Sequence, residues 1–127
     1  MVERIVYEHL KTSIGSSFEG GVYFHSAGSD SGLPRLVIWQ VDDPSDKHLL
    51  SRYGGQARIQ CDIWARQPFE LPGLRKIVRD ALRQIRTTEY GVQIYNTIIA
   101  NELTRELDDT ELYSAIVDVI VYWTQEA

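Results

Sequence analysis

The segment Gln56–Arg86 constrains the fold most, because its hydrophobic period changes once, from that of a strand to that of a helix. In its first part apolar and polar residues alternate. One face holds Ala57, Ile59, Cys61, Ile63 and Ala65, and the other holds Arg58, Gln60, Asp62, Trp64 and Arg66. A period of two is typical of a half-buried strand. After Gln67–Pro68 the apolar residues recur at spacings of three and four: Leu71, Leu74, Ile77, Val78, Ala81, Leu82 and Ile85. The sequence therefore predicts a strand followed almost at once by a long helix that packs on a core.

Size and composition indicate a single domain, residues 1–127, with an ordinary hydrophobic core. The net charge of −5 makes a general affinity for nucleic acid or an anionic membrane unexpected. No apolar run is long enough to span a bilayer, and the N-terminal residues do not form a secretory signal. The single cysteine excludes an intramolecular disulfide. We therefore expect a soluble protein of a reducing, intracellular compartment.

The remaining periodicities predict one further helix and four further strands. The helix is expected at Val2–Thr12, and the strands at Val22–His25, Arg35–Val41, Val92–Leu103 and Leu112–Trp123. The last two strands should form an antiparallel hairpin around a turn at Asp108–Asp109. Ser26–Pro34 is expected to be a mobile loop, and Asp42–Gly55 a long connection in which Pro44–Leu50 can form one helical turn capped by Ser45. The order α-β-β-β-α-β-β predicts an α+β fold: a single mainly antiparallel sheet, a short N-terminal helix, and one long helix packed on the sheet.

Cys61 with a histidine is the first enzymatic hypothesis that the sequence raises. A nucleophilic cysteine needs a base and a partly open, electropositive setting. Cys61 instead lies in the middle of a strand on the apolar face, as a buried structural thiol does. The three histidines, His9, His25 and His48, lack the paired spacing of metal ligands. The nucleotide and hydrolase motifs GxGxxG, GxxxxGK[ST] and GxSxG are absent, so we expect neither cofactor nor metal.

Acidic residues provide two further candidate sites, one in a loop and one in a strand. Asp42, Asp43 and Asp46 lack the frame of a calcium loop, which favours a solvated loop, with a weak divalent-cation or subunit contact as the alternative. Asp118 is the one charge inside an apolar strand. We expect it to pair with a cross-strand partner such as Arg58, or to lie at the open edge of the sheet. An intracellular enzyme or ligand-binding domain that uses Cys61 or the Asp42–Asp46 loop is the alternative to a structural role.

Basic and aromatic residues provide the candidates for contacts with other molecules. The outer side of the long helix carries Arg75, Lys76, Arg79, Arg83 and Arg86. This pattern favours a solvated face, with Asp80 balancing part of the charge; contact with an acidic neighbour or with passing DNA is the alternative. Trp64 falls on the polar face of its strand, beside Arg66. A half-exposed tryptophan next to an arginine is typical of a protein–protein contact.

Several of these segments together resemble one family. The strand R-I-Q-C-D-I-W-A-R at Arg58–Arg66 is followed by a helix that contains V-R-D-A-L at Val78–Leu82. The step Leu33–Pro34 precedes an apolar strand, and Tyr113–Trp123 forms an alternating last strand. In these patterns, in length and in element order, most of the chain resembles the tail terminator, or tail completion, proteins of long-tailed bacteriophages.

The resemblance implies a structural role without cofactor or reaction. Proteins of this family form a ring, usually of six subunits, at the head-proximal end of the tail tube. The implied partners are other copies of the chain, the major tail tube protein and the head-side connector protein. No membrane and no specific nucleic acid is implied, although DNA would pass through the ring. The implied location is the head–tail junction of the virion, after synthesis in the cytoplasm of the bacterial host. The interface candidates are Asp42, Asp43, Asp46, Lys47, Arg52, Trp64, Arg66, Arg75, Arg79 and Arg83.

Overall fold

A computed structural model describes residues 2–25, 32–41, 54–106 and 113–125. Its helices are α1 (Val2–Ile14) and α2 (Leu71–Arg83), with short 3-10 turns at Gly15–Ser17 and Pro68–Glu70. Its strands are β1 (Gly21–Phe24), β2 (Arg35–Val41), β3 (Gly54–Ala65), β4 (Thr87–Glu89), β5 (Val92–Glu106) and β6 (Tyr113–Gln125). Neither described helix is long and apolar enough to cross a membrane.

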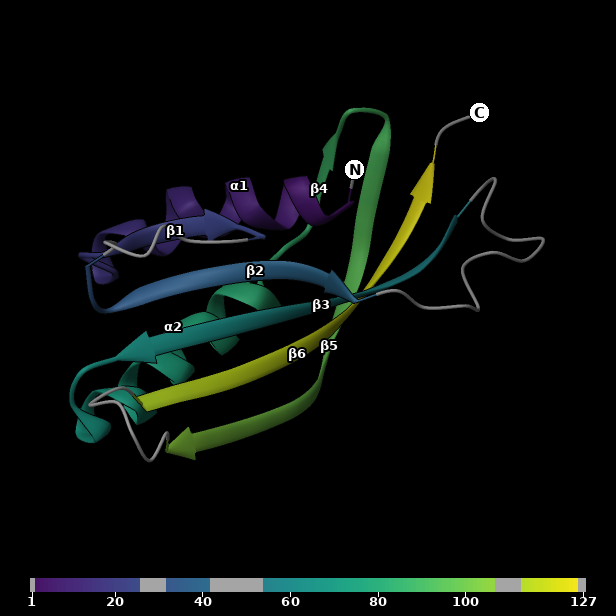
Figure 1. The fold of residues 1–127 in the computed structure, drawn as a ribbon. Coiled ribbons are helices and arrows are strands. Elements are labelled where there is room, and N and C mark those ends of the chain that lie inside the picture. The colour runs from purple at the N-terminus through teal and green to yellow at the C-terminus, as the bar shows by residue number, and fades with distance from the viewer. Residues whose placement is uncertain (1, 26–31, 42–53, 107–112, 126–127) are drawn as a thin grey trace.

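The strands form one six-stranded sheet in the order β1-β2-β3-β6-β5-β4 (Figure 1). All neighbouring strands are antiparallel except β1 and β2, which are parallel. The two long strands β5 and β6 pair along almost their whole length, as the predicted hairpin requires. The prediction of an α+β fold with a mainly antiparallel sheet is confirmed.

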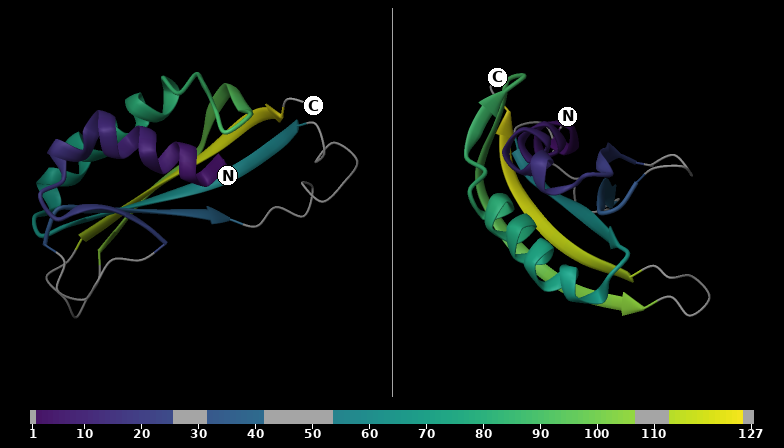
Figure 2. Two further views of the ribbon diagram at one scale, coloured as in Figure 1. Left: turned by 90° about the horizontal axis from the view of Figure 1, so that it is seen from above. Right: turned by 90° about the vertical axis from the view of Figure 1, so that its left-hand side faces the viewer.

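Both helices pack on the same face of the sheet (Figure 2). The predicted strand Gln56–Arg66 lies at the centre of the sheet as β3, between β2 and β6. All five residues of its apolar face are buried, and Cys61 is paired there with Ile38 of β2 and Val117 of β6. The core between the sheet and the helices also contains Ile5, Val6 and Leu10 of α1, Leu71, Leu74, Val78, Ala81 and Leu82 of α2, and Ile85. The change of hydrophobic period thus marks the change from sheet to covering helix.

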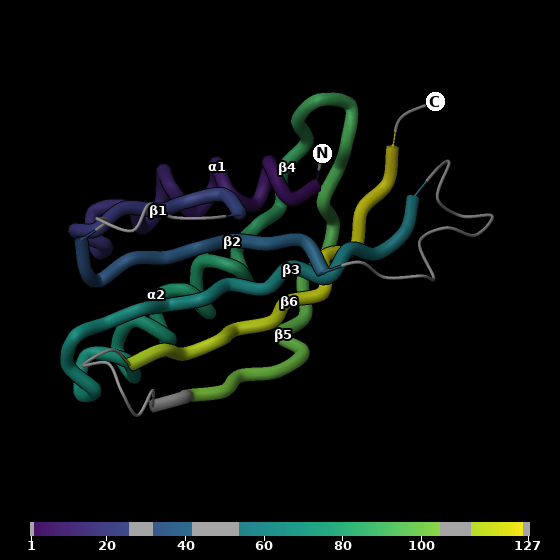
Figure 3. Tube along the Cα trace, viewed as in Figure 1, coloured from purple at the N-terminus to yellow at the C-terminus, as the bar shows by residue number. Residues whose placement is uncertain are grey.

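The structure adds one strand to the predicted order. Strand β4 follows α2 and pairs with the beginning of β5, around the two-residue turn Tyr90–Gly91 (Figure 3). Both turn residues have positive φ, 55° for Tyr90 and 75° for Gly91. Positive φ at both positions gives the twist that joins two antiparallel strands by two residues. The parallel pairing of β1 with β2 was likewise not predicted.

Several predicted connections lie wholly or partly outside the described residues. These are residues 26–31 of the Ser26–Pro34 loop, residues 42–53 of the Asp42–Gly55 connection, and the turn at Asp108–Asp109. The prediction that Gly54 and Gly55 belong to the connection was wrong. Both residues are part of β3 and pair with Thr124 and Trp123 of β6.

Candidate protein interfaces

The face of the sheet opposite α1 and α2, here called the open face, combines apolar and aromatic side chains. From the strand register it includes Val37, Trp39, Trp64, Ile98, Leu103, Ile116, Ile120 and Tyr122. Ile98 and Leu103 are 46 % and 47 % exposed, and Trp39 is also exposed. Isolated exposed apolar residues are common, but a group of them along neighbouring strands is typical of an interaction surface. The open face is therefore the first candidate interface.

Polar contacts hold the aromatic rings of the open face in place. The indole N–H of Trp39 donates a hydrogen bond of 3.0 Å to Asp62. The guanidinium of Arg35 lies 5.7 Å from the centre of the Trp64 ring, in cation–π geometry. Tryptophan and arginine side chains held in this way are the residue types that contribute most to binding energy in protein interfaces. The predicted half-exposed position of Trp64 agrees with its placement here.

Two carboxylates lie almost buried among these rings. Asp118 accepts a bond of 3.3 Å from Arg58, which is the cross-strand pair expected from the sequence. Asp62 accepts bonds from Trp39 and, at 2.8 Å, from the amide of Gln60. Asp62 and Asp118 are only 7 % and 8 % exposed. Their neighbours therefore cover the acidic groups, while the Arg58 side chain extends toward solvent.

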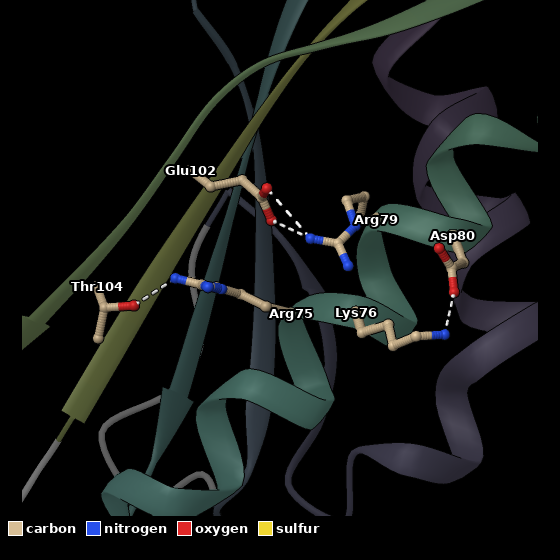
Figure 4. Close-up of polar contacts among 6 residues, drawn as sticks. All are labelled: Arg75, Lys76, Arg79, Asp80, Glu102 and Thr104. Atoms are coloured by element: carbon tan, nitrogen blue, oxygen red, sulfur yellow. Dashed lines mark hydrogen bonds and ion pairs between the residues drawn. The ribbon is translucent and has the colours of Figure 1, made fainter.

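The basic side of α2 is divided between two roles (Figure 4). Arg79 donates bonds of 3.2 and 3.3 Å to the carboxylate of Glu102, and Arg75 donates one of 2.7 Å to the hydroxyl of Thr104. Both acceptors belong to β5, so these arginines attach the helix to the sheet. Lys76 pairs with Asp80 at 3.1 Å, as the prediction of a charge-balanced solvated face requires. Arg83 is exposed and follows the same prediction.

The two ends of β3 differ in what they expose. At one end, Arg66 is exposed and the corner before α2 carries Phe69, the side chain of which is 75 % exposed. Near the other end lies Tyr90, in the turn between β4 and β5. Its hydroxyl donates to the carboxylate of Glu8 in α1, and the same carboxylate pairs with Arg4 at 3.1 Å. Phe69 and Tyr90 were not among the residues predicted from the sequence, although each is an aromatic residue beside a proline or a glycine in a short connection, which is a recognisable signal.

A cleft of about 260 Å³ lies between α1 and β4, beside the contact of Tyr90 with Glu8. It is lined by Ile5, Glu8, His9, Thr12, Ser13, Thr87 and Glu89. Burial lowers the pKa of His9, and a hydrogen bond with the backbone of Ala81 and the Glu89 carboxylate oppose this effect. Glu8 is paired with Arg4, whereas Glu89 has no ion pair among the described residues, so Glu89 gives the cleft its acidic character. We call it the α1–β4 cleft.

The environments of Cys61 and of the histidines bear on the enzymatic hypotheses. Cys61 is fully buried, and mainly this burial raises the pKa of its thiol far above the usual range. A nucleophilic cysteine needs the opposite environment. His9 lies in the α1–β4 cleft, whereas His25 contacts Glu3 at 3.0 Å and stacks on Phe24, 4.3 Å between ring centres. Within the described ranges, no group of histidine, cysteine or acidic residues is arranged to hold a metal ion.

The structure describes half of the interface candidates predicted from the sequence. Trp64 lies on the open face and Arg66 at its end, whereas Arg75, Arg79 and Arg83 lie on α2. Asp42, Asp43, Asp46, Lys47 and Arg52 lie outside the described residues. The candidates thus fall on two separate surfaces, the open face and the outer side of α2. Their role in contacts stays a prediction.

The fold can be compared with those of known proteins. No protein-family model matches the chain, and no curated protein gives a significant sequence match. Among solved structures, the fold is similar to that of a chain from the virion of the native gene transfer agent particle. The TM-score is 0.70 with 11 % identical residues, and the match covers 97 % of this chain and 94 % of that chain. The two chains therefore share a fold over nearly their whole length.

Proposed function

We propose that this chain is a structural protein of a phage-like virion. In this role it forms a closed ring of six subunits at the head-proximal end of the tail tube. The ring ends polymerisation of the tube and joins the tail to the head-side connector. The observation that carries the proposal is the fold shared with a virion chain over nearly the full length of both proteins. The sequence patterns of tail terminator proteins support the same role.

The open face suits a protein that functions as an assembly. A ring requires contacts between two different surfaces of the subunit, repeated until the ring closes. The open face supplies one such surface, with the exposed apolar residues Ile98 and Leu103, the half-exposed Trp64, and Arg66 at the end of β3. We place Trp64 and Arg66 in contacts between subunits or with the tube. Arg75 and Arg79 already bind β5, so we expect them to support such contacts by positioning α2.

The proposal is tested first by sedimentation of the purified protein over a wide concentration range. We expect a discrete species with the mass of six chains, without larger species at higher concentration, because a closed ring has no free end. The second arm adds the protein to a polymerising tail tube protein and measures tube length by electron microscopy. Tubes should become shorter, with the protein bound at one end. A protein that stays monomeric and also leaves tube length unchanged would contradict the proposal.

A further inference from the structure

The two ends of β3 lie far apart, and the side chains near them differ in charge. The corner with Arg66 and Phe69 follows Ala65, the last residue of β3. The β4–β5 hairpin lies at the first residues of β3, because Gly54 pairs with Thr124, which in turn pairs with Gln93. A strand of 12 residues separates these ends by roughly 40 Å at about 3.3 Å per residue. One subunit therefore cannot bring the two ends together, whereas neighbouring subunits can.

The corner presents a cation and an aromatic ring that nothing described engages. Arg66 is exposed and makes no ion pair or hydrogen bond with any residue that the structure describes. Phe69 is the most exposed of the large apolar residues in the described part of the chain. Pro68 fixes the backbone between them at the first position of a 3-10 turn. An exposed aromatic residue on a rigid corner loses little conformational freedom when it is buried at an interface.

The α1–β4 cleft offers the opposite chemistry. The Glu8 carboxylate is held by Arg4 and by the hydroxyl of Tyr90. Glu89 is exposed and has no ion pair within the described ranges, so its charge is uncompensated. The hydroxyls of Thr12, Ser13 and Thr87 add further hydrogen-bond acceptors. Such a lining favours a side chain with a cationic head. Tyr90, beside Glu89, stays half exposed although the guanidinium of Arg4 lies 4.9 Å from the centre of its ring, so part of the ring is open to apolar contact.

We infer that the subunits join head to tail, with Arg66 of one copy in the α1–β4 cleft of the next copy, paired with Glu89. Phe69 of the first copy packs against Tyr90 of the second. The inference rests on the proposed ring and names the contact that closes it. Since the two surfaces differ, the contact repeats in one direction, as a ring requires.

Charge reversal tests this contact directly. In Arg66→Glu, the acidic corner of one copy would meet the acidic Glu89 of the next copy. In Glu89→Lys, the basic Arg66 of one copy would meet the new lysine of the next copy. Because like charges repel, each variant alone should associate at least about tenfold more weakly than the wild type. In an equimolar mixture every contact is again between opposite charges. The mixture should therefore recover closed rings in which the two variants alternate, and the double variant should form rings alone. Sedimentation gives the size, and native mass spectrometry gives the ratio of variants.

Two controls separate the contact from general effects of charge. Arg66→Lys keeps the cation and should keep the ring, and Glu19→Lys repeats the reversal at an exposed site between α1 and β1. Circular dichroism checks that every variant is folded. If both single variants form rings as well as the wild type does, or if their mixture stays dissociated, the Arg66–Glu89 contact is wrong. Neither result contradicts the proposed ring. Wild-type protein that neither forms rings nor binds tube ends would overturn both the contact and the ring.

Discussion

At the scale of single residues, the open face contains two carboxylates that are almost fully buried on the side away from both helices. For Asp118, the cationic partner in the described part of the chain is Arg58, and its second oxygen is buried without a hydrogen-bond partner there. A buried charge that loses its partner is more costly than the pair is favourable. The Arg58–Asp118 pair is therefore a sensitive point of the sheet.

Arg58→Ala should lower the free energy of unfolding by about 1–2 kcal/mol, less than for a fully buried pair because Arg58 is half exposed. Adding Asp118→Asn should recover part of this loss, since the amide removes the uncompensated charge. Urea unfolding of the two single variants and the double variant measures the coupling. If the loss of unfolding free energy in the double variant equals the sum of the losses in the two single variants, the two side chains do not stabilise each other.

The pKa of His9 gives a second prediction at this scale. Burial lowers it in the folded protein, so the unfolded chain binds a proton first as the pH falls. Stability is then fully present above the ordinary histidine pKa of about 6.5 and decreases as the pH falls below it. His9→Gln should weaken this decrease, as measured by urea unfolding at about pH 7.5 and pH 5.5. Equal decreases in the wild type and the variant would contradict the prediction.

At the scale of elements, the attachment of α2 to β5 depends on polar contacts as well as on the core. The buried hydroxyl of Thr97 donates a bond of 2.8 Å to the carbonyl of Leu82, in the last turn of α2. The guanidinium of Arg86 donates to the same hydroxyl at 3.3 Å. Carbonyls of the last helical turn have no partner within the helix. The Leu82 carbonyl also accepts a bond of 3.4 Å from the backbone N–H of Ile85, and Thr97 adds a shorter bond from the sheet.

Thr97→Val keeps the shape of the side chain and removes the donor. It should lower the free energy of unfolding by about 1–2 kcal/mol, because the Leu82 carbonyl then loses this partner. Thr88→Val, at an exposed position of β4, is the matched control and should have little effect. Thermal or urea unfolding gives both values. An equal effect of the two substitutions would show that the contact does not stabilise the element pair.

Elements were predictable where one period extends over many residues. β3, α2 and β6 have such periods, because one side of each is buried in the core. β4 is three residues long and has no measurable period, and its turn uses Tyr90 where asparagine or aspartate would have been recognised. The cleft is lined by residues of α1 and of β4, which are far apart in the sequence, and no local pattern contains that juxtaposition.

The contacts of the helix arginines show the same limit within the candidate interfaces. The spacing of Lys76 and Asp80 by four residues made their pair predictable. Arg79 and Glu102 are connected by the register of β5, which has two irregularities, at Tyr95 and at Ala100. Each irregularity shifts the faces of the strand by one residue. The sequence could therefore indicate that one face of the helix is basic, but it could not indicate which of its arginines form hydrogen bonds with β5.

At the scale of the whole molecule, one face of the sheet is packed by helices and the other carries exposed rings and apolar side chains. Trp64→Ala should weaken association of subunits by about 10- to 100-fold, the usual effect of a tryptophan at the centre of an interface. Sedimentation measures association, and urea unfolding of the dissociated protein measures stability, which should change less. A variant that is unfolded, or one that assembles like the wild type, would contradict the prediction.

Both ends of the described chain lie beside the β4–β5 hairpin (Figure 1). The last residue of β6, Gln125, pairs with Val92, and Arg4 of α1 lies over the ring of Tyr90. This arrangement matters for sample preparation. An affinity tag on either terminus would emerge near the α1–β4 cleft and hinder the neighbouring copy. Assembly is therefore best measured after the tag has been cleaved.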